Sequence, residues 1–242
     1  MSLSEVLAIA HRGACAYAPE NTRAAFDLAL LQGATHMELD VRITADGKAA
    51  VLHDPSLERT TNGTGLAAER TLAELQTLDA GSWFHPKFVG ERIPSYREVL
   101  ERYAEQAHLH TEIKDAPAGF PSAVADLIRE AGAESQTTVT SFSLPTLVEI
   151  RSHAPELRLG WLVHRPTDSI VATAQSAGFG LLCPRASHVG AAQVQHLHEQ
   201  GFVVRVWGVK TEAEMRKAAE DGVDGMTVDF PDKLLQYLKE HG

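Results

Sequence analysis

The sequence predicts an α/β fold, a (β/α)₈ TIM barrel in which eight parallel strands alternate with eight helices. Short apolar runs alternate with amphipathic segments along almost the whole chain, which is typical of repeated βα units. The length of 242 residues also suits this fold, because eight such units usually take about 250 residues. A doubly wound open sheet is the competing interpretation, since it is built from the same units.

The first βα unit and the second strand are the clearest elements. Leu7–Ala10 is a short apolar run, and Thr22–Leu31 has helical spacing, with Gly33 just beyond its end as a C-cap signal. The second strand is predicted over about His36–Val41. The Asp46-Gly47 pair then lies between two alternating runs and is a strong hairpin signal.

The hairpin leads into an irregular segment. Val51–His53 is expected to return antiparallel beside the second strand, which would bring His53 to the polar end of that strand. Residues 54–94 break the regular alternation, apart from a short helix near Leu72–Leu78. Long excursions of this kind in compact domains are usually functional, so residues 54–94 are expected to be an insertion that covers a site.

Regular alternation resumes after the insertion and continues to the end of the chain. The predicted strands are Leu109–Ile113, Thr137–Thr140, Arg158–Val163, Gly180–Cys183, Val203–Trp207 and Gly225–Val228. The predicted helices are Ser95–Glu105, Ala123–Ala131, Leu144–Ser152, Ser169–Ala177, Ala191–Gln200, Glu212–Glu220 and Asp232–Lys239. With the hairpin return counted as an accessory strand, the chain has eight predicted strands and eight predicted helices. Because it shows no linker or strong internal repeat, a single domain is predicted over residues 1–242.

Composition excludes several classes of protein. Hydrophobic residues make up 44% of the chain, which excludes disorder of the whole. A net charge of −10 argues against nucleic acid as a partner, but not against a small phosphate ligand. Cys15 and Cys183 suit neither a disulfide framework nor a Cys-x-x-Cys zinc site. Without a secretory signal or an apolar stretch of ~20 residues, no stable membrane anchor and a cytoplasmic location are expected, and the oligomeric state is left open.

Three acidic side chains fall at the C-terminal ends of predicted strands, where barrel enzymes gather their functional residues. Glu38 and Asp40 are two residues apart, so both point to one side of the second strand, and Glu112 ends the third. Acids in a barrel mouth are unfavourable unless they are paired or bind a cation. Their oxygen donors suit Mg²⁺ or Ca²⁺, with simple solvation of the three acids as the plainer alternative.

Two of the twelve histidines fall where these acids fall. His11 follows the first strand, and His53 returns to the same end of the barrel through the hairpin. Because imidazole titrates near neutral pH, the two could serve as general acid and general base. The other ten histidines are interpreted as structural or solvated.

Two cationic residues accompany these groups. Arg12 offers a planar fork to phosphate oxygens, and Lys114 adds a point charge. The alternative for Lys114 is that it only neutralises Glu112. A metal, a phosphate and two histidines together indicate hydrolysis or transfer at a phosphodiester.

An ordered set of short motifs resembles the glycerophosphodiester phosphodiesterase family over nearly the whole chain. Each motif is weak alone, but the set is specific in this order and at these spacings. The motifs are His11-Arg12-Gly13, Pro19-Glu20-Asn21-Thr22, Glu38-Leu39-Asp40-Val41, Asp46-Gly47 followed by Val51-Leu52-His53-Asp54, Thr60-Thr61-Asn62-Gly63 and Glu112-Ile113-Lys114.

The resemblance implies metal-dependent hydrolysis of glycerophosphodiesters, such as glycerophosphocholine, to glycerol 3-phosphate and an alcohol. Either water or the neighbouring glycerol hydroxyl would attack phosphorus. The implied roles are divalent cation binding (Mg²⁺ or Ca²⁺) by Glu38, Asp40 and Glu112, general acid/base catalysis by His11 and His53, and phosphate binding by Arg12 and Lys114.

Five further residues lie at predicted strand ends or within or close to these motifs. Trp207 is a candidate wall of the glycerol pocket, although an aromatic residue at a strand end is as often in the core. Phe142 is a second candidate wall. The Asn21-Thr22 pair fits the family motif and equally fits a plain helix N-cap. Cys15 has no evident base partner and is interpreted as a bystander.

Two other functions stay open at this stage. A lipid phosphodiesterase resembling lysophospholipase D or phosphoinositide phospholipase C would share the barrel and the metal site, but the acidic charge and the lack of an anchor disfavour it. An inactive phosphoester-binding barrel is disfavoured because the acids, histidines and cations are all present.

Overall fold

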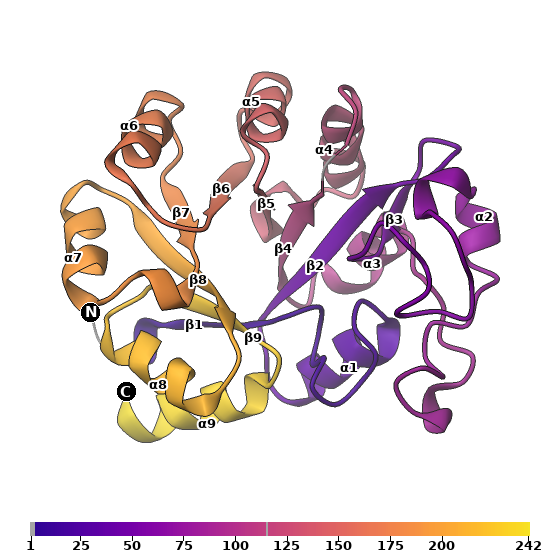
Figure 1. Cartoon of the computed structure of the whole chain (residues 1–242), viewed down its shortest axis with the longest axis horizontal. Coiled ribbons are helices and arrows are strands. Elements are labelled where there is room, and N and C mark those ends of the chain that lie inside the picture. Colours follow the sequence, from indigo (N-terminus) through magenta and orange to yellow (C-terminus); the bar gives the residue numbers. More distant parts are fainter. Residues whose placement is uncertain (1–2, 115) are drawn as a thin grey trace.

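Eight parallel strands close into a barrel within residues 3–114 and 116–242, which the computed structural model describes. Around the barrel they follow the order β1-β9-β8-β7-β6-β5-β4-β2, and pairing of β1 with β2 closes the ring. The short strand β3 lies outside the ring and pairs antiparallel with β2. Figure 1 shows the helices arranged around the strands. The predicted (β/α)₈ barrel is therefore confirmed, and the open sheet is wrong.

The elements have the following bounds. The strands are β1 Leu7–Ala10, β2 His36–Ile43, β3 Ala49–Val51, β4 His108–Ile113, β5 Thr137–Ser141, β6 Arg158–Val163, β7 Leu181–Pro184, β8 Val203–Val209 and β9 Gly225–Val228. The α-helices are α1 Arg23–Leu31, α2 Leu72–Leu75, α3 Tyr96–Tyr103, α4 Phe120–Glu130, α5 Leu144–His153, α6 Asp168–Ser176, α7 Ala191–Glu199, α8 Glu212–Glu220 and α9 Pro231–His241. Short 3₁₀ helices span Leu3–Glu5, Ala67–Glu69, Pro86–Phe88, Glu134–Gln136 and Ala186–His188.

Side-chain caps and buried apolar faces explain most of these boundaries. Ser95 and Thr211 each form a capping box with a glutamate three residues later, which satisfies backbone N–H groups at the starts of α3 and α8. The parallel strands are covered by helices outside and by side chains inside, so β5 and β9 are buried along their whole length. Among the described helices, none is long and apolar enough to cross a membrane.

The hairpin return begins two residues earlier than predicted. Gly47 N donates to Thr44 O at 3.0 Å, and Thr44 N donates to Lys48 O at 3.0 Å, so the turn ends at Lys48 and pairing starts at Ala49. His53 consequently lies beyond the end of β3 rather than inside it. It still reaches the acidic end of β2, because Leu52 N donates to Asp40 O at 3.0 Å.

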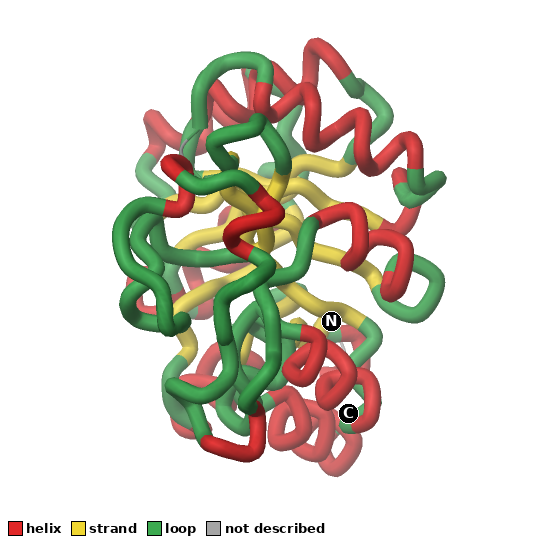
Figure 2. Tube along the Cα trace, turned by 90° about the vertical axis from the view of Figure 1, so that its right-hand side faces the viewer, coloured by secondary structure: helices red, strands yellow, loops and turns green. Residues whose placement is uncertain are grey.

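The insertion after the hairpin has a small core of its own. Its apolar side chains pack with Ala50 and Leu52 of the hairpin return in a cluster separate from the barrel core, to which the insertion contributes Leu57, Ala67, Leu75, Ala80 and Ile93. The helix predicted over Leu72–Leu78 ends at Leu75 and continues only as turns. Figure 2, seen from the right-hand side of Figure 1, shows that this side of the molecule is mostly loop. That residues 54–94 cover the site stays a prediction.

Three of the histidines interpreted as structural gather at the opposite, N-terminal end of the barrel. His36, His108 and His110 have ring centroids 4.9–5.3 Å apart and help to line a cavity of about 540 Å³. Arg205 of β8 contacts Nδ1 of His110 from inside the barrel. Burial lowers the pKa of all three imidazoles, that of His108 to about 4.

These shifts predict a loss of stability in acid. The folded pKa of His108 is about 4 and its usual value is 6.5, so the unfolded chain binds protons first and the free energy of unfolding falls as pH drops from 6.5 towards 4. Replacing the half-buried His108 with glutamine should remove roughly 1–2 kcal/mol of that loss, less than the full shift because of solvent screening. Urea unfolding at neutral pH and near pH 5 measures it, with exposed His196→Gln as control. An unchanged pH dependence in His108→Gln contradicts the assignment.

Candidate active site

The C-terminal ends of the barrel strands surround a cavity of about 190 Å³. Seven of the eight side chains proposed from the sequence line it, namely His11, Arg12, Glu38, His53, Glu112, Lys114 and Trp207. The eighth, Asp40, is fully buried and in ionic contact with both Arg12 and Lys114. The fold thus brings all eight residues together.

The three acids form one buried cluster. Asp40 of β2 is the register partner of Glu112 of β4, and Glu38 stands two residues earlier on β2. One carboxylate oxygen from each lies within 4.8 Å of the others. The residues are only 5% (Glu38), 0% (Asp40) and 9% (Glu112) exposed, so simple solvation does not describe them.

The pKa values of these carboxylates are shifted in opposite directions. Burial and the charge of Asp40 raise the pKa of Glu38 well above its usual range, and the same two causes raise the pKa of Glu112. Burial alone would also raise the pKa of Asp40, but Lys114 and Arg12 outweigh it and lower that pKa. The cluster therefore has more carboxylates than its two cations neutralise, and a further positive charge would stabilise it.

Arg12 is held against the acids by an unusual backbone conformation. Its φ is +53°, and its backbone N–H donates to Glu38 at 3.1 Å while its Nε lies 3.1 Å from Asp40. The next residue, Gly13, has φ +81°, and a Cβ there would lie 2.5 Å from the carbonyl carbon of Ala25. Glycine is thus required after Arg12 by both conformation and space.

Lys114 fits both interpretations made from the sequence. Its ammonium lies 2.5 Å from Glu112 and 2.8 Å from Asp40, so it does neutralise acids. It also borders the cavity, where an anionic ligand would meet it.

The Asn21-Thr22 pair also serves two purposes. Thr22 is the N-cap of α1, and its side chain accepts a hydrogen bond from Ala25 N. Asn21 has φ +57° and donates from Nδ2 to Asp40 at 2.8 Å, so it orients a member of the acidic cluster. The capping and functional interpretations therefore apply to different residues of the pair.

Each candidate catalytic histidine is held by an aspartate at Nδ1. His11 Nδ1 lies 2.5 Å from Asp229, and His53 Nδ1 lies 2.6 Å from Asp54. Because the pKa of each aspartate is lowered, Asp54 to about 2 by its bond from Arg59, both are ionised and can only accept. The Nδ1–H groups therefore donate, which leaves Nε2 of each ring free to exchange a proton.

Burial acts on the pKa of both histidines in the same direction. Burial lowers the pKa of His11 below 6.5, although the bond to Asp229 opposes this shift. Burial likewise lowers the pKa of His53. A neutral imidazole with Nδ1–H fixed is ready to accept a proton at Nε2.

Asp229 and the ion pairs that Arg59 of the insertion forms were not identified from the sequence. Asp229 directly follows β9, so the rule that located the other residues at strand ends also points to it. Arg59 carries no such signal. It lies in the insertion, bonds Asp54, and donates to Glu20 at 2.7 and 2.8 Å, while Glu20 accepts from Arg12 at 2.7 Å. This chain of ion pairs joins His53 to Arg12.

Aromatic side chains form one wall of the cavity. Trp207 and Phe142 meet edge to face with ring centroids 5.2 Å apart, and both line the cavity. The indole N–H of Trp207 donates to Val163 O at 3.1 Å. The β8–β9 register shifts between Val206 and Val209, with Gly208 at φ +77°, and bulges of this kind redirect side chains near sites.

Cys15, for which the sequence shows no evident base partner, contacts two residues of the site. Its Sγ lies 3.2 Å from Asp229 Oδ1 and 3.9 Å from His11 Nδ1. Burial and the charge of Asp229 raise the thiol pKa, so Cys15 is a protonated donor rather than a nucleophile. Spacing along the chain gave no indication of this contact, since Asp229 is 214 residues away.

A barrel with buried acids, two His–Asp pairs and two cations at one mouth defines a class of hydrolase that acts on phosphate esters. The family model described as "Glycerophosphoryl diester phosphodiesterase family" matches residues 11–233. The chain belongs to this family, and it is an enzyme of the phosphodiesterase class.

Relatives and solved structures agree with this membership. A Mycobacterium tuberculosis protein named "Probable glycerophosphodiester phosphodiesterase 1" is 51% identical over 96% of this chain and 92% of its own length. A "Glycerophosphodiester phosphodiesterase" of Caldanaerobacter subterraneus is 34% identical over 98% of this chain and its full length. A phosphodiesterase of Oleispira antarctica, solved in complex with the product sn-glycerol-3-phosphate, has a TM-score of 0.90, 29% identity and coverage of 99% and 100%.

Proposed function

We propose that this enzyme hydrolyses small glycerophosphodiesters to glycerol 3-phosphate and an alcohol, and that it needs Mg²⁺ or Ca²⁺ to do so. The observation that carries the proposal is the buried cluster of three carboxylates beside two His–Asp pairs at one cavity. The Oleispira antarctica phosphodiesterase, which was solved with sn-glycerol-3-phosphate, supports the choice of substrate.

Glu38, Asp40 and Glu112 would hold the cation. Carboxylate oxygens are the donors that Mg²⁺ and Ca²⁺ prefer, and the raised pKa values of Glu38 and Glu112 fit a cluster that gains from added positive charge. When bound, the cation would supply Lewis-acid stabilisation of charge on a phosphoryl oxygen. Asn21 fixes the orientation of Asp40 through its bond of 2.8 Å.

The two histidines would move the protons of the reaction. One accepts at Nε2 the proton of the attacking water or glycerol hydroxyl as the new P–O bond forms. The other enters the step as an imidazolium and delivers its Nε2 proton to the departing alkoxide as the old P–O bond breaks, so the products are a phosphomonoester, or first a cyclic phosphodiester, and an alcohol. Asp229 and Asp54 fix the imidazole tautomers that this exchange requires.

Arg12 and Lys114 would bind the phosphate. Both cations border the cavity and are tied to the acidic cluster, so their positions relative to the carboxylates are fixed. Fixed positive charge offsets the negative charge that develops on the phosphoryl oxygens. A cavity of about 190 Å³ is small for an acyl chain, which favours a polar substrate over a lysophospholipid.

The aromatic wall predicts a binding role for Trp207. Trp207 would pack against the glycerol or head-group carbons, so Trp207→Ala should raise KM for glycerophosphocholine by about tenfold, equivalent to roughly 1.4 kcal/mol, and change kcat less. Steady-state kinetics decide the matter, with the exposed Trp83→Ala as control. A kcat loss larger than the KM change contradicts the assignment.

A substrate panel tests the proposed reaction. Glycerol 3-phosphate release would be measured by a coupled assay from glycerophosphocholine and glycerophosphoethanolamine, and choline release from lysophosphatidylcholine. We expect turnover of the two small diesters and little of the lipid. Preference for lysophosphatidylcholine would favour the lipid phosphodiesterase instead, and binding without turnover of any compound would indicate an inactive barrel.

The cytoplasmic location stays a prediction.

A further inference from the structure

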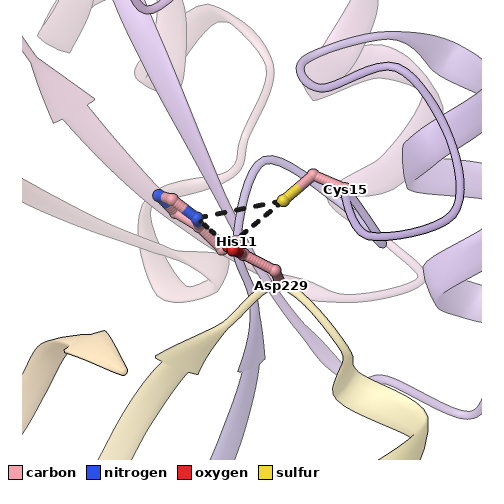
Figure 3. A group of neighbouring side chains, drawn as sticks. All are labelled: His11, Cys15 and Asp229. Carbon is pink, nitrogen blue, oxygen red and sulfur yellow. Dashed lines mark hydrogen bonds and ion pairs between the residues drawn. The ribbon is translucent and has the colours of Figure 1, made fainter. Parts of the chain in front are cut away.

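A second set of potential metal ligands lies behind His11, apart from the three carboxylates. Its members are His11, Cys15 and Asp229, one nitrogen, one sulfur and one oxygen donor, all half-buried. Figure 3 shows the three side chains meeting at one point, while the second ring nitrogen of His11 points away from the other two. No step of the proposed reaction uses Cys15.

The distances suit a tetrahedral metal ion of the zinc type. Zinc bonds of about 2.0–2.3 Å to nitrogen, oxygen and sulfur imply separations of roughly 3.3–3.6 Å between neighbouring ligand atoms. The two separations of Cys15 Sγ are 3.2 Å to Asp229 and 3.9 Å to His11, close to these values. The third, 2.5 Å between His11 and Asp229, is a hydrogen bond that would have to open by nearly 1 Å.

We propose that His11, Cys15 and Asp229 form an inhibitory site for a thiophilic divalent cation such as Zn²⁺. The donor set separates it from the carboxylate cluster, because thiolate and imidazole favour Zn²⁺ while an all-oxygen site favours Mg²⁺ or Ca²⁺. Three protein ligands leave a fourth position for water.

The backbone already holds the two ligand-bearing segments together. His11 N donates to Val228 O and Ala16 N donates to Asp229 O, both at 2.9 Å, so the loop that carries Cys15 is clamped to the end of β9. Only side-chain movement is then needed to admit an ion. A site that is largely formed beforehand loses little conformational entropy when it binds.

Binding of the cation would release one proton to solvent and move a second proton from Nδ1 to Nε2 of His11. In the metal-free protein the thiol S–H and the imidazole Nδ1–H both face Asp229. The cation replaces both protons. The thiol proton leaves to solvent, while the imidazole is bound at Nδ1 and carries its proton at Nε2. His11 can then no longer accept a proton at Nε2, so the site inhibits, a step that rests on the proposed function of His11.

Cobalt spectroscopy tests occupation of the site without reference to activity. Co²⁺ would be added to the enzyme in saturating Mg²⁺, which fills the carboxylate cluster, with a thiol-free reductant present. A thiolate-to-cobalt charge-transfer band should appear in wild type. It should also appear in the control Cys183→Ala, which removes the buried thiol of β7. The band should be absent in both Cys15→Ser and Cys15→Ala. Two variants are used so that misfolding of one of them does not decide the result.

Inhibition by Zn²⁺ tests the second half of the proposal. With each activity normalised to that of the same variant in Mg²⁺, wild type and Cys183→Ala should be inhibited at Zn²⁺ concentrations at least about tenfold lower than Cys15→Ser. A band that is missing in wild type, or that persists without Cys15, overturns the site. Equal Zn²⁺ sensitivity of wild type and Cys15→Ser overturns the inhibitory role. A clear band in a protein that turns over no substrate would instead count against the proposed function alone.

Discussion

His11→Ala and His53→Ala are each expected to lower kcat for glycerophosphocholine hydrolysis by about 10²–10⁴-fold, the usual contribution of a positioned acid or base. Each variant removes the group proposed to exchange the proton, together with the hydrogen bond that this group donates to its aspartate. KM should change much less, because Arg12 and Lys114 still bind the phosphate. Steady-state kinetics with coupled detection of glycerol 3-phosphate, at saturating divalent cation, measure the effect.

The chain supplies a matched control for this experiment. His196 is exposed on α7, away from the cavity, so His196→Ala should keep the wild-type kcat. Wild-type rates in both His11→Ala and His53→Ala would show that the acid/base assignment is wrong. A loss in only one of them would reduce the pair to a single catalytic histidine.

Asp40→Asn and Glu112→Gln should each lower kcat/KM by about 10³-fold or more. Each amide keeps the shape of the side chain but removes a charge, so the affinity for Mg²⁺ or Ca²⁺ falls and with it several kcal/mol of stabilisation of the developing phosphoryl charge. Activity is measured across a titration of each cation, and binding of the cation is measured by calorimetry on the same protein. Unchanged cation affinity in both variants contradicts the ligand assignment.

Loss of charge also changes the ion pairs of Arg12 and Lys114, so the folded fraction of each variant has to be followed by circular dichroism. The exposed carboxylate of Asp126, paired with Arg129 and His153 at the surface, gives the control Asp126→Asn. That variant should keep both the activity and the cation affinity of wild type.

The barrel could be predicted because its periodicity is local. Apolar runs such as Arg158–Val163 and Gly225–Val228 have their predicted bounds in the structure, since burial on both faces and turn residues at both ends leave little choice. The return of the hairpin was displaced by two residues, because the hydrogen bonds of the Thr44–Lys48 turn set where pairing begins. Boundaries depend on such turn geometry, which composition does not specify.

The positions of the candidate site residues were predictable wherever such a residue stands at the end of a strand. Glu38, Asp40 and Glu112 followed from their places on β2 and β4, and the hairpin explained His53. Contacts between distant segments were not predictable. Cys15 meets Asp229, and Arg59 of the insertion meets Glu20, only after the barrel has closed and the loops have packed. A single sequence carries no signal for such pairs.

Removal and return of the divalent cation test the central claim most directly, that three buried carboxylates hold an ion needed for phosphodiester hydrolysis. The enzyme would be treated with EDTA, the chelate removed, and glycerol 3-phosphate release from glycerophosphocholine measured before and after addition of Mg²⁺ or Ca²⁺. We expect activity to disappear on chelation and to return with one of the two cations in wild type, but not in Glu112→Gln. Full activity in chelator, with residual metal excluded by elemental analysis, would contradict the claim.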